Sequence, residues 1–265
     1  MNLVTLTSDY GNADHDIAAF KGQLLSDAPN SQIIDVSHAV SPYNVMQAAY
    51  LLGRTYKRFP AGTVHIILVD AYQGSTKNYL VAQIEGQYFV AADNGVLTLI
   101  APDIGFEKLV AVDLRNTNQN LYPEDALAQI SAHLLKGGKP DVLGQPAREY
   151  TVKSASRPTL KTDGNGIIAN VIHIDTFGNL VTNVTRKWLK DHVGDRKLIV
   201  VARNKRITRL VDSYFEGPTE GELFGVFNRD GHLEIAVQKP AGKFKNSACS
   251  LLGLHVNNNI FIEFE

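Results

Sequence analysis

The stretch "TVHIILVD", residues 63–70, indicates how the chain folds, because it is an apolar run that ends abruptly at a carboxylate. Apolar runs of this length are typical of strands covered on both faces, as in parallel sheets between helices. The residues that follow, "AYQGSTKN" (71–78), are small and polar. We therefore expect Asp70 at the carboxyl end of a buried strand, beside either a plain surface turn or a ligand crevice.

Strand and helix patterns alternate around this run. The predicted strands are 3–7, 32–37, 79–84, 88–93 and 109–114, and the predicted helices are 14–26, 42–56 and 123–138. Asn94-Gly95 is the strongest turn signal in the chain and predicts a hairpin. The alternation indicates an α/β N-terminal domain over residues 1–150 with a mixed central sheet.

The second half has a different pattern. Residues 151–165 show little periodicity and are expected to be a linker. From residue 166 to 265 strand signals dominate, which predicts a smaller all-β, barrel-like C-terminal domain.

The composition narrows the function classes. The 265 residues are 44% hydrophobic, enough for a sizeable core, and a net charge of −1 does not favour nucleic acid as a partner. The single Cys249 excludes an internal disulfide, the N-terminus reads as a strand and not a signal peptide, and no apolar stretch reaches the roughly 20 residues that span a bilayer. We expect a cytoplasmic protein that does not bind membranes.

Familiar cofactor motifs are absent from the sequence. It has no phosphate-binding glycine loop, no H-E-x-x-H and no C-x-x-C, and its histidines lack the spacing of metal ligands. We expect neither a metal nor a cofactor.

Polar residues at strand ends are the remaining candidates. Asp9 follows the first strand, where with Asp70 it would border one crevice and could hold a pair of ribose hydroxyls. Asp9 could equally be a turn residue, and Asp14 a helix N-cap. Tyr43, in the first turn of a helix, could stack on a base or a cationic sulfur, or be a simple rim contact.

The stretch "IHIDTFGNLVTN" (172–183) is the most specific. A strand leads to Asp175, and Phe177 and Asn179 follow it. An aromatic face beside an amide can stack on a purine and pair with its edge, and Gly178 permits close backbone approach.

Taken together, these stretches resemble the S-adenosylmethionine (SAM) hydroxide adenosyltransferase family, which also includes the fluorinase and chlorinase enzymes. The matching stretches run from residue 3 to about 237: "TLTSDYG", "IIDVSHAVSPYNV", "ILVD", "ADNGVLT", "HIDTFGNLVTN" and "GHLEIAV". The resemblance implies an N-terminal α/β domain, a C-terminal β-barrel, and a homotrimer with sites between subunits. It also implies an adenosyl ligand as the small-molecule partner, with SAM as substrate.

The resemblance further implies roles for single residues. Asp9 falls where the family holds the ribose hydroxyls, and Asp14 where it meets the methionine amino group. The other matching ligand positions are Tyr43, which flanks the ligand, and Asp175, Phe177 and Asn179, which bind its methionine and adenine ends.

The water-activating positions depart from the family pattern. The family stretch V-D-P-G-V-G-T-x-R reads "VDAYQGSTK" here, so Asp70 is kept and Lys77 replaces the arginine. Lysine keeps the charge but lacks the planar fork that clamps a carboxylate. F-H-G-R-D reads "LYPED", so Tyr122 replaces the histidine and Glu124 the arginine. A tyrosine with an ordinary pKa near 10 is a poor base at neutral pH.

Two functions from different classes follow. The first is a SAM-cleaving enzyme that uses water to form adenosine and methionine, with Asp70, Lys77 and Tyr122 as a modified catalytic triad. The alternative is a protein of the same fold that binds SAM or adenosine without turnover. A halogenase is disfavoured, because the charge of Asp70 would repel a halide.

Overall fold

The computed structural model describes residues 2–72, 78–113, 122–194 and 196–265. The chain forms two compact units, residues 1–155 and 156–265. Within the described ranges no helix is long and apolar enough to cross a membrane. The domain boundaries expected from the sequence stay a prediction.

The first unit is built on a mixed sheet of seven strands in the order β2-β1-β3-β5-β4-β6-β7. The strands are β1 (Asn2–Ser8), β2 (Ser31–Ser37), β3 (Val64–Leu68), β4 (Tyr79–Ile84), β5 (Gln87–Ala92), β6 (Lys108–Val112) and β7 (Gly144–Pro146). β2, β1, β3 and β5 are parallel, whereas β4 pairs antiparallel with both β5 and β6. The expected α/β class with a mixed sheet is confirmed.

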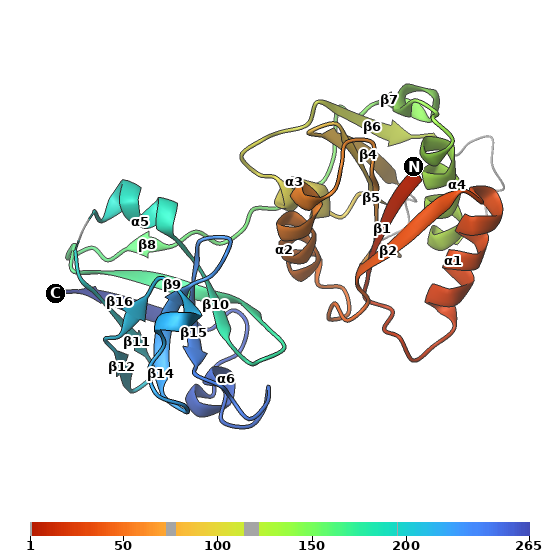
Figure 1. Ribbon diagram of the computed structural model, residues 1–265. Coiled ribbons are helices and arrows are strands. Elements are labelled where there is room, and N and C mark those ends of the chain that lie inside the picture. The colour runs from red at the N-terminus through yellow and green to blue at the C-terminus, as the bar shows by residue number, and fades with distance from the viewer. Residues whose placement is uncertain (1, 73–77, 114–121, 195) are drawn as a thin grey trace. The chain divides into compact units, whose positions relative to one another are not determined.

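Helices cover both faces of this sheet (Figure 1). α1 (Asp16–Asp27) and α4 (Pro123–Leu135) lie on one face, and α2 (Val45–Thr55) and α3 (Val96–Ile100) lie on the other. Short 3-10 turns span Tyr56–Arg58 and Pro140–Val142. In β3, Ile66 packs in the cluster with α1 and α4, whereas Ile67 packs in the cluster with α2 and α3. Burial on both sides explains why the stretch around β3 is continuously apolar.

Three local expectations were wrong. Asn94-Gly95 does not close a hairpin: Gly95, at φ 86°, is the N-cap of α3. His15 and not Asp14 is the N-cap residue of α1, and it makes no side-chain cap bond. Tyr43 precedes α2, whose N-cap is Asn44. At Asp14 and Tyr43 the predicted helix is present and only its first residue differs, whereas after Gly95 the helix α3 was not predicted.

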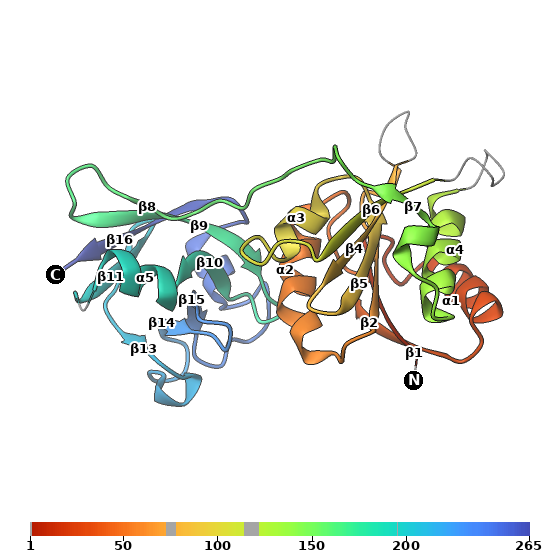
Figure 2. The same ribbon diagram turned by 90° about the horizontal axis from the view of Figure 1, so that it is seen from above.

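The second unit contains a nine-stranded sheet in the order β12-β11-β16-β9-β10-β15-β14-β13, with β8 paired to β9 (Figure 2). Its strands are β8 (Thr159–Leu160), β9 (Gly166–Ile174), β10 (Leu180–Thr185), β11 (Leu198–Ala202), β12 (Lys205–Ile207), β13 (Leu210–Val211), β14 (Leu223–Phe227), β15 (His232–Val237) and β16 (Asn259–Phe264). Residues of β12 contact residues of β14, so the two ends of the sheet approach each other and the sheet is nearly barrel-shaped.

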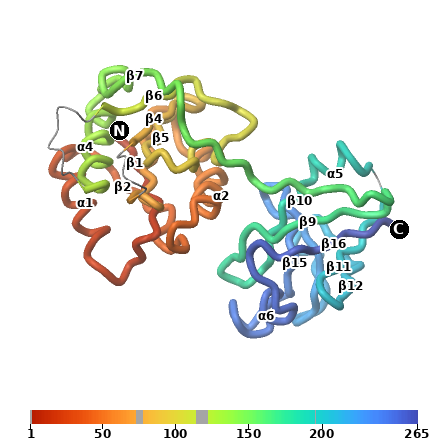
Figure 3. The backbone as a smooth tube through the Cα atoms, turned by 180° about the vertical axis from the view of Figure 1, so that it is seen from behind, coloured from red at the N-terminus to blue at the C-terminus, as the bar shows by residue number. Residues whose placement is uncertain are grey.

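The second unit is not all-β. It includes α5 (Arg186–His192), α6 (Ala248–Leu252) and a 3-10 turn at Tyr214–Glu216. Figure 3 follows the chain through this unit from β9 and β10 to β16 near the C-terminus. Both helices are short and lie between strands. Their sequence patterns were therefore not distinguished from those of the surrounding strands.

The buried face of α4 gives a test of the first core. Leu127 is fully buried in α4, and Leu25 in α1 is 40% exposed. Alanine keeps both helices favourable, so the substitutions differ chiefly in burial. We expect Leu127→Ala to lower the free energy of unfolding by about 3 kcal/mol and Leu25→Ala by less than about 1 kcal/mol. Urea unfolding followed by circular dichroism measures both; equal losses would contradict this packing.

Candidate functional site

The Asp9 carboxylate connects three strand ends of the first unit. Asp9 follows β1, and its Oδ2 accepts hydrogen bonds from the backbone N–H of Tyr43 at 2.7 Å and of Asp70 at 3.3 Å. Tyr43 lies beyond β2 and Asp70 beyond β3. Both donors have positive φ, 62° and 50°, which is uncommon outside glycine. Two uncommon backbone conformations therefore direct their N–H groups at one carboxylate oxygen.

A buried amide supports the Asp70 turn from the other side. Asn94, which is 1% exposed, donates from Nδ2 to the carbonyl oxygens of Val69 at 2.9 Å and Asp70 at 3.2 Å. Its Oδ1 accepts the N–H of Val96 at 3.1 Å, at the start of α3. Asn94 thus ties the end of β3 to the first turn of a helix. The Asn94-Gly95 dipeptide, which was predicted to form a hairpin turn, instead provides the side chain that supports the end of β3.

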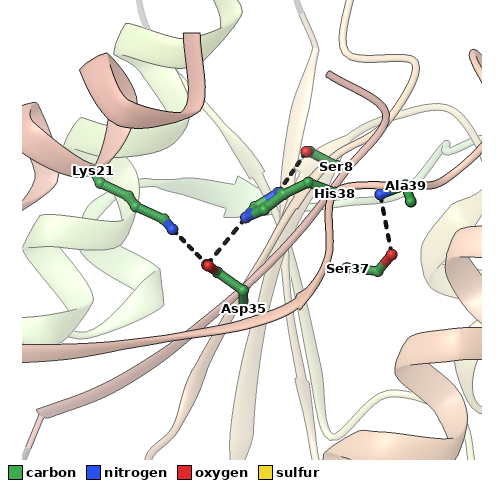
Figure 4. A network of polar contacts seen from close by, with 6 residues as sticks. All are labelled: Ser8, Lys21, Asp35, Ser37, His38 and Ala39. Carbon is green, nitrogen blue, oxygen red and sulfur yellow. Dashed lines mark hydrogen bonds and ion pairs between the residues drawn. The ribbon is translucent and has the colours of Figure 1, made fainter. Parts of the chain in front are cut away.

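A polar network holds the residue before Asp9 (Figure 4). Ser8 Oγ lies 2.7 Å from His38 Nδ1, and His38 Nε2 lies 3.0 Å from the Asp35 carboxylate. Lys21 pairs with the same carboxylate at 2.6 Å. Burial acts to raise the pKa of Asp35, but the bonds from Lys21 and His38 outweigh it and lower that pKa.

His38 also bonds on the far side of Asp9. Its carbonyl oxygen accepts the N–H of Gly11 at 2.8 Å, while its ring contacts Ser8. Asp9 is therefore bracketed by two contacts to one histidine. The network fixes the chain before and after the carboxylate.

A second carboxylate, Glu124 at the start of α4, is surrounded by tyrosines. Tyr10 donates its hydroxyl to Glu124 Oε1 at 2.5 Å, and the Tyr72 hydroxyl lies 2.9 and 3.0 Å from Oε1 and Oε2. Burial and the hydrogen bond to Glu124 raise the pKa of both Tyr10 and Tyr72. Burial, with the charge of Glu124, raises the pKa of Tyr79 to about 12.

In the second unit, Asp175 shapes the turn between β9 and β10. Its Oδ1 accepts the N–H groups of Phe177 at 2.9 Å and Asn179 at 2.8 Å, and its Oδ2 accepts Asn179 Nδ2 at 2.8 Å. Gly178 has φ 79°, and a Cβ there would lie 2.5 Å from Ser247. The turn places Phe177 outward, 62% exposed, and Asn179 inward, 5% exposed.

The Asn179 amide has a defined orientation. Nδ2 donates to Asp175 and also to the Tyr214 hydroxyl at 3.1 Å, while Oδ1 is buried without a hydrogen-bond partner. Tyr214 in turn donates to Glu234 at 2.5 Å. Burial raises the pKa of Glu234, against the bonds from Tyr214 and Asn228 that lower it. A buried acceptor without a partner is costly, and Oδ1 retains its full capacity to accept a hydrogen bond.

The structure brings some of the predicted site residues together and not others. Asp9, Tyr43 and Asp70 meet through hydrogen bonds, and so do Asp175, Phe177 and Asn179. Asp14 lies exposed in the loop before α1. Tyr122 is the N-cap of α4 and 67% exposed, and Lys77 lies outside the described residues.

Sequence reasoning missed the partners of these residues. Glu124 was noted only as a departure at a helix start, and Tyr10 and Tyr72 were not considered. The sequence signal that could have identified Tyr10 and Tyr72 was their position. Tyr10 follows β1 and Tyr72 follows β3, and the carboxyl ends of these two strands reach the edge of the sheet where α4 begins. Within the ranges described, no group of three or more His, Cys, Asp or Glu side chains is arranged to hold a metal ion.

Carboxylates at the carboxyl ends of parallel strands are typical of the class of α/β proteins that bind small ligands at that edge of the sheet. Residues 4–144 match the SAM hydroxide adenosyltransferase N-terminal domain, and residues 169–261 match the C-terminal domain of that family. The chain belongs to the SAM hydroxide adenosyltransferase family.

Curated relatives carry two names. An (R)-S-adenosyl-L-methionine hydrolase of Methanocaldococcus jannaschii is 27% identical over 99% of this chain and 96% of its own. A fluorinase of an Actinoplanes species is 27% identical over 88% of this chain and 90% of its own. A crystal structure of an uncharacterized conserved protein from Thermotoga maritima superposes with a TM-score of 0.83 at 28% identity, covering 98% of this chain and 99% of that one.

The Asn94 amide gives a test of the strand-end support. Asn94→Asp keeps the acceptor for Val96 but replaces the donor to the Val69 and Asp70 carbonyls by an oxygen. We expect a loss of about 2–3 kcal/mol in unfolding free energy, because a buried and a part-buried carbonyl lose their donor. Asn12→Asp adds the same charge in an exposed loop and should cost less than about 0.5 kcal/mol. Similar melting temperatures for the two variants would show that Asn94 is not a support.

Proposed function

We propose that the protein cleaves SAM, with water attacking C5′ of the ribose to give adenosine and methionine. Family membership and the relatives named (R)-S-adenosyl-L-methionine hydrolase support this reaction. The observation that carries it is Asp70, a carboxylate at the end of β3 in a constrained turn next to Asp9. The proposal assigns Asp70 to orient the attacking water.

The reaction needs little from the protein beyond placement. The oxygen of water forms a bond to C5′, the C5′–sulfur bond breaks, and its electron pair stays on sulfur as the neutral thioether of methionine. Because this leaving group is neutral, no general acid is required. The protein has to hold the water in line behind C5′, accept its proton and exclude bulk solvent. We assign no cofactor to this reaction.

The ligand contacts follow from the two clusters. In the first unit we assign Asp9 Oδ1 to a ribose hydroxyl, since Oδ2 already accepts two backbone N–H groups. Tyr43, 73% exposed, is assigned to flank the ligand, and Asp14 to the methionine amino group. Asp175 is assigned to the methionine end through the turn that it shapes.

The second cluster fits adenine. Phe177 presents an exposed ring for stacking, and Asn179 Oδ1 supplies an acceptor for the exocyclic N6–H of the base. Asn179 Nδ2 donates hydrogen bonds to both Tyr214 and Asp175, so a flip of the amide would break two hydrogen bonds. The orientation of this amide therefore favours adenine over a base with an oxygen at position 6.

We further propose the wider arrangement that the family resemblance implies. The protein is a cytoplasmic homotrimer, with a barrel-like C-terminal domain and sites that combine the N-terminal domain of one subunit with the C-terminal domain of another. Size-exclusion chromatography with light scattering tests the assembly: a monomeric mass at micromolar concentration would contradict it.

Asp70→Asn tests the reaction. Asparagine tolerates positive φ and has the same shape, so the turn should persist while the charge is lost. We expect the rate of adenosine formation from SAM to fall by about 10²–10⁴-fold, with the SAM dissociation constant changed by less than about 5-fold. Chromatography of the products and calorimetric titration measure the two quantities.

A second candidate is a protein that binds SAM or adenosine without turnover. Two replaced positions favour it, since Lys77 and Tyr122 stand where the family pattern has an arginine and a histidine. Saturable SAM binding with no adenosine above the buffer blank would support this candidate and reject hydrolysis.

Base discrimination tests the adenine assignment independently of turnover. Inosine carries an oxygen where adenosine carries N6–H, and that oxygen would face Asn179 Oδ1 with no donor between them. We expect adenosine to bind about 10–100-fold more tightly than inosine, because an unpaired buried acceptor costs about 1–3 kcal/mol. Tyr214→Phe should reduce this ratio, since it removes one of the two hydrogen bonds that orient the Asn179 amide. Equal affinities for the two nucleosides in calorimetry would reject the assignment.

A further inference from the structure

The cluster of Tyr10, Tyr72 and Glu124 joins three separate elements at one edge of the first sheet. Tyr10 follows β1, Tyr72 follows β3, and Glu124 lies in the first turn of α4. Tyr72 is two residues after Asp70, and its hydroxyl reaches both oxygens of the Glu124 carboxylate. The cluster is thus joined along the chain to Asp70, the residue assigned to orient the water, and through Tyr10 to the neighbouring Asp9, whose carboxylate accepts the Asp70 N–H.

The two tyrosines of the cluster differ in exposure. Tyr10 is half-buried and donates to Oε1 at 2.5 Å, whereas Tyr72 is 59% exposed. A half-buried hydroxyl with a short bond is suited to holding the carboxylate in place. An exposed phenol that donates to a carboxylate keeps an oxygen lone pair that can accept a bond from water. The same contact therefore offers a path from solvent to Glu124.

The protonation of the phenols fits this path. The pKa of Tyr72 and that of Tyr10 are both raised, by burial and by the bond to Glu124. Both hydroxyls therefore carry their protons at neutral pH. Glu124 is the group in the cluster that can take up a further proton, because an ionised carboxylate is an acceptor only.

We propose that Tyr72 and Glu124 form a proton relay for the attacking water, with Tyr10 as the positioning residue for Glu124. The inference rests on the proposed function, because the proton in question is released when water attacks C5′. It assigns the orienting of water to Asp70 and the uptake of its proton to the Tyr72–Glu124 pair.

The step balances as follows. As the water oxygen bonds to C5′ and the C5′–sulfur electron pair returns to sulfur, one water proton passes to the Tyr72 oxygen. The phenolic proton of Tyr72 passes at the same time to a Glu124 oxygen. The products are adenosine, methionine and a protonated Glu124, which returns its proton to solvent. No oxidant, reductant or further reactant takes part.

Two substitutions test the relay. Tyr72→Phe removes the connection and Glu124→Gln removes the proton acceptor, while each retains the shape of the side chain. We expect both to lower kcat for adenosine formation by about 10²-fold or more and to leave the SAM dissociation constant within about 3-fold. Tyr150→Phe is the matched control, because Tyr150 keeps its ring contact with Phe106 and should retain wild-type kcat.

A split between turnover and binding separates a relay from a purely structural contact. Tyr10→Phe removes the hydroxyl that holds the Glu124 carboxylate in place. We expect kcat for adenosine formation to fall by about 10-fold while the SAM dissociation constant stays within about 3-fold. A contact that only pins α4 would lower the melting temperature and leave kcat unchanged.

The outcomes distinguish the relay from the proposed function. Active wild-type protein, with Tyr72→Phe and Glu124→Gln impaired and the kcat of Tyr10→Phe lowered, supports the relay. Active wild-type protein with unimpaired Tyr72→Phe or Glu124→Gln, or with an unchanged kcat for Tyr10→Phe, overturns the relay alone. Wild-type protein that binds SAM and releases no adenosine overturns both.

Discussion

The hydrogen bonds to Asp9 are the constraint on which the arrangement of the first unit's strand ends depends. One carboxylate oxygen collects backbone N–H groups from beyond β2 and β3, and both donors hold left-handed conformations to reach it. Such conformations cost free energy and persist where surrounding contacts fix them. Asn94 supplies that support at β3, and His38 holds the chain on each side of Asp9. This edge of the sheet is thereby ordered by hydrogen bonds within the chain itself.

The fold was predictable where burial imposes a pattern on the sequence. The run around β3 alternates between two cores, so both of its faces must be apolar and the strand stands out. α4 was predictable for the same reason, with Pro123 at its entry. The structure at Asn94-Gly95 was not predictable, because this dipeptide is compatible with both a hairpin turn and the start of a helix. The contact of the Asn94 side chain with the distant Val69 carbonyl distinguishes the two, and the sequence does not reveal that contact.

The site was predictable in part for the same reason. Asp9 and Asp70 could be expected to approach each other, because the ends of neighbouring parallel strands share an edge. The link between Tyr72 and Glu124 could not, since it joins residues 52 apart in the chain through side chains. Asn179 was identified from its motif, yet the orientation of its amide depends on Tyr214, 35 residues later. The sequence pattern identifies where strands end. Contacts between side chains that are far apart in the chain can be identified only from the three-dimensional structure.

The left-handed backbone at Asp70 has an evolutionary consequence. Aspartate, asparagine and glycine are the residues that adopt such a backbone most readily. A single base change converts either aspartate codon into an asparagine codon or a glycine codon. A lineage can therefore lose the charge at position 70 in one step while it keeps the turn and the fold around it. Such a step would leave the scaffold intact and remove only the carboxylate that we assign to orient the attacking water.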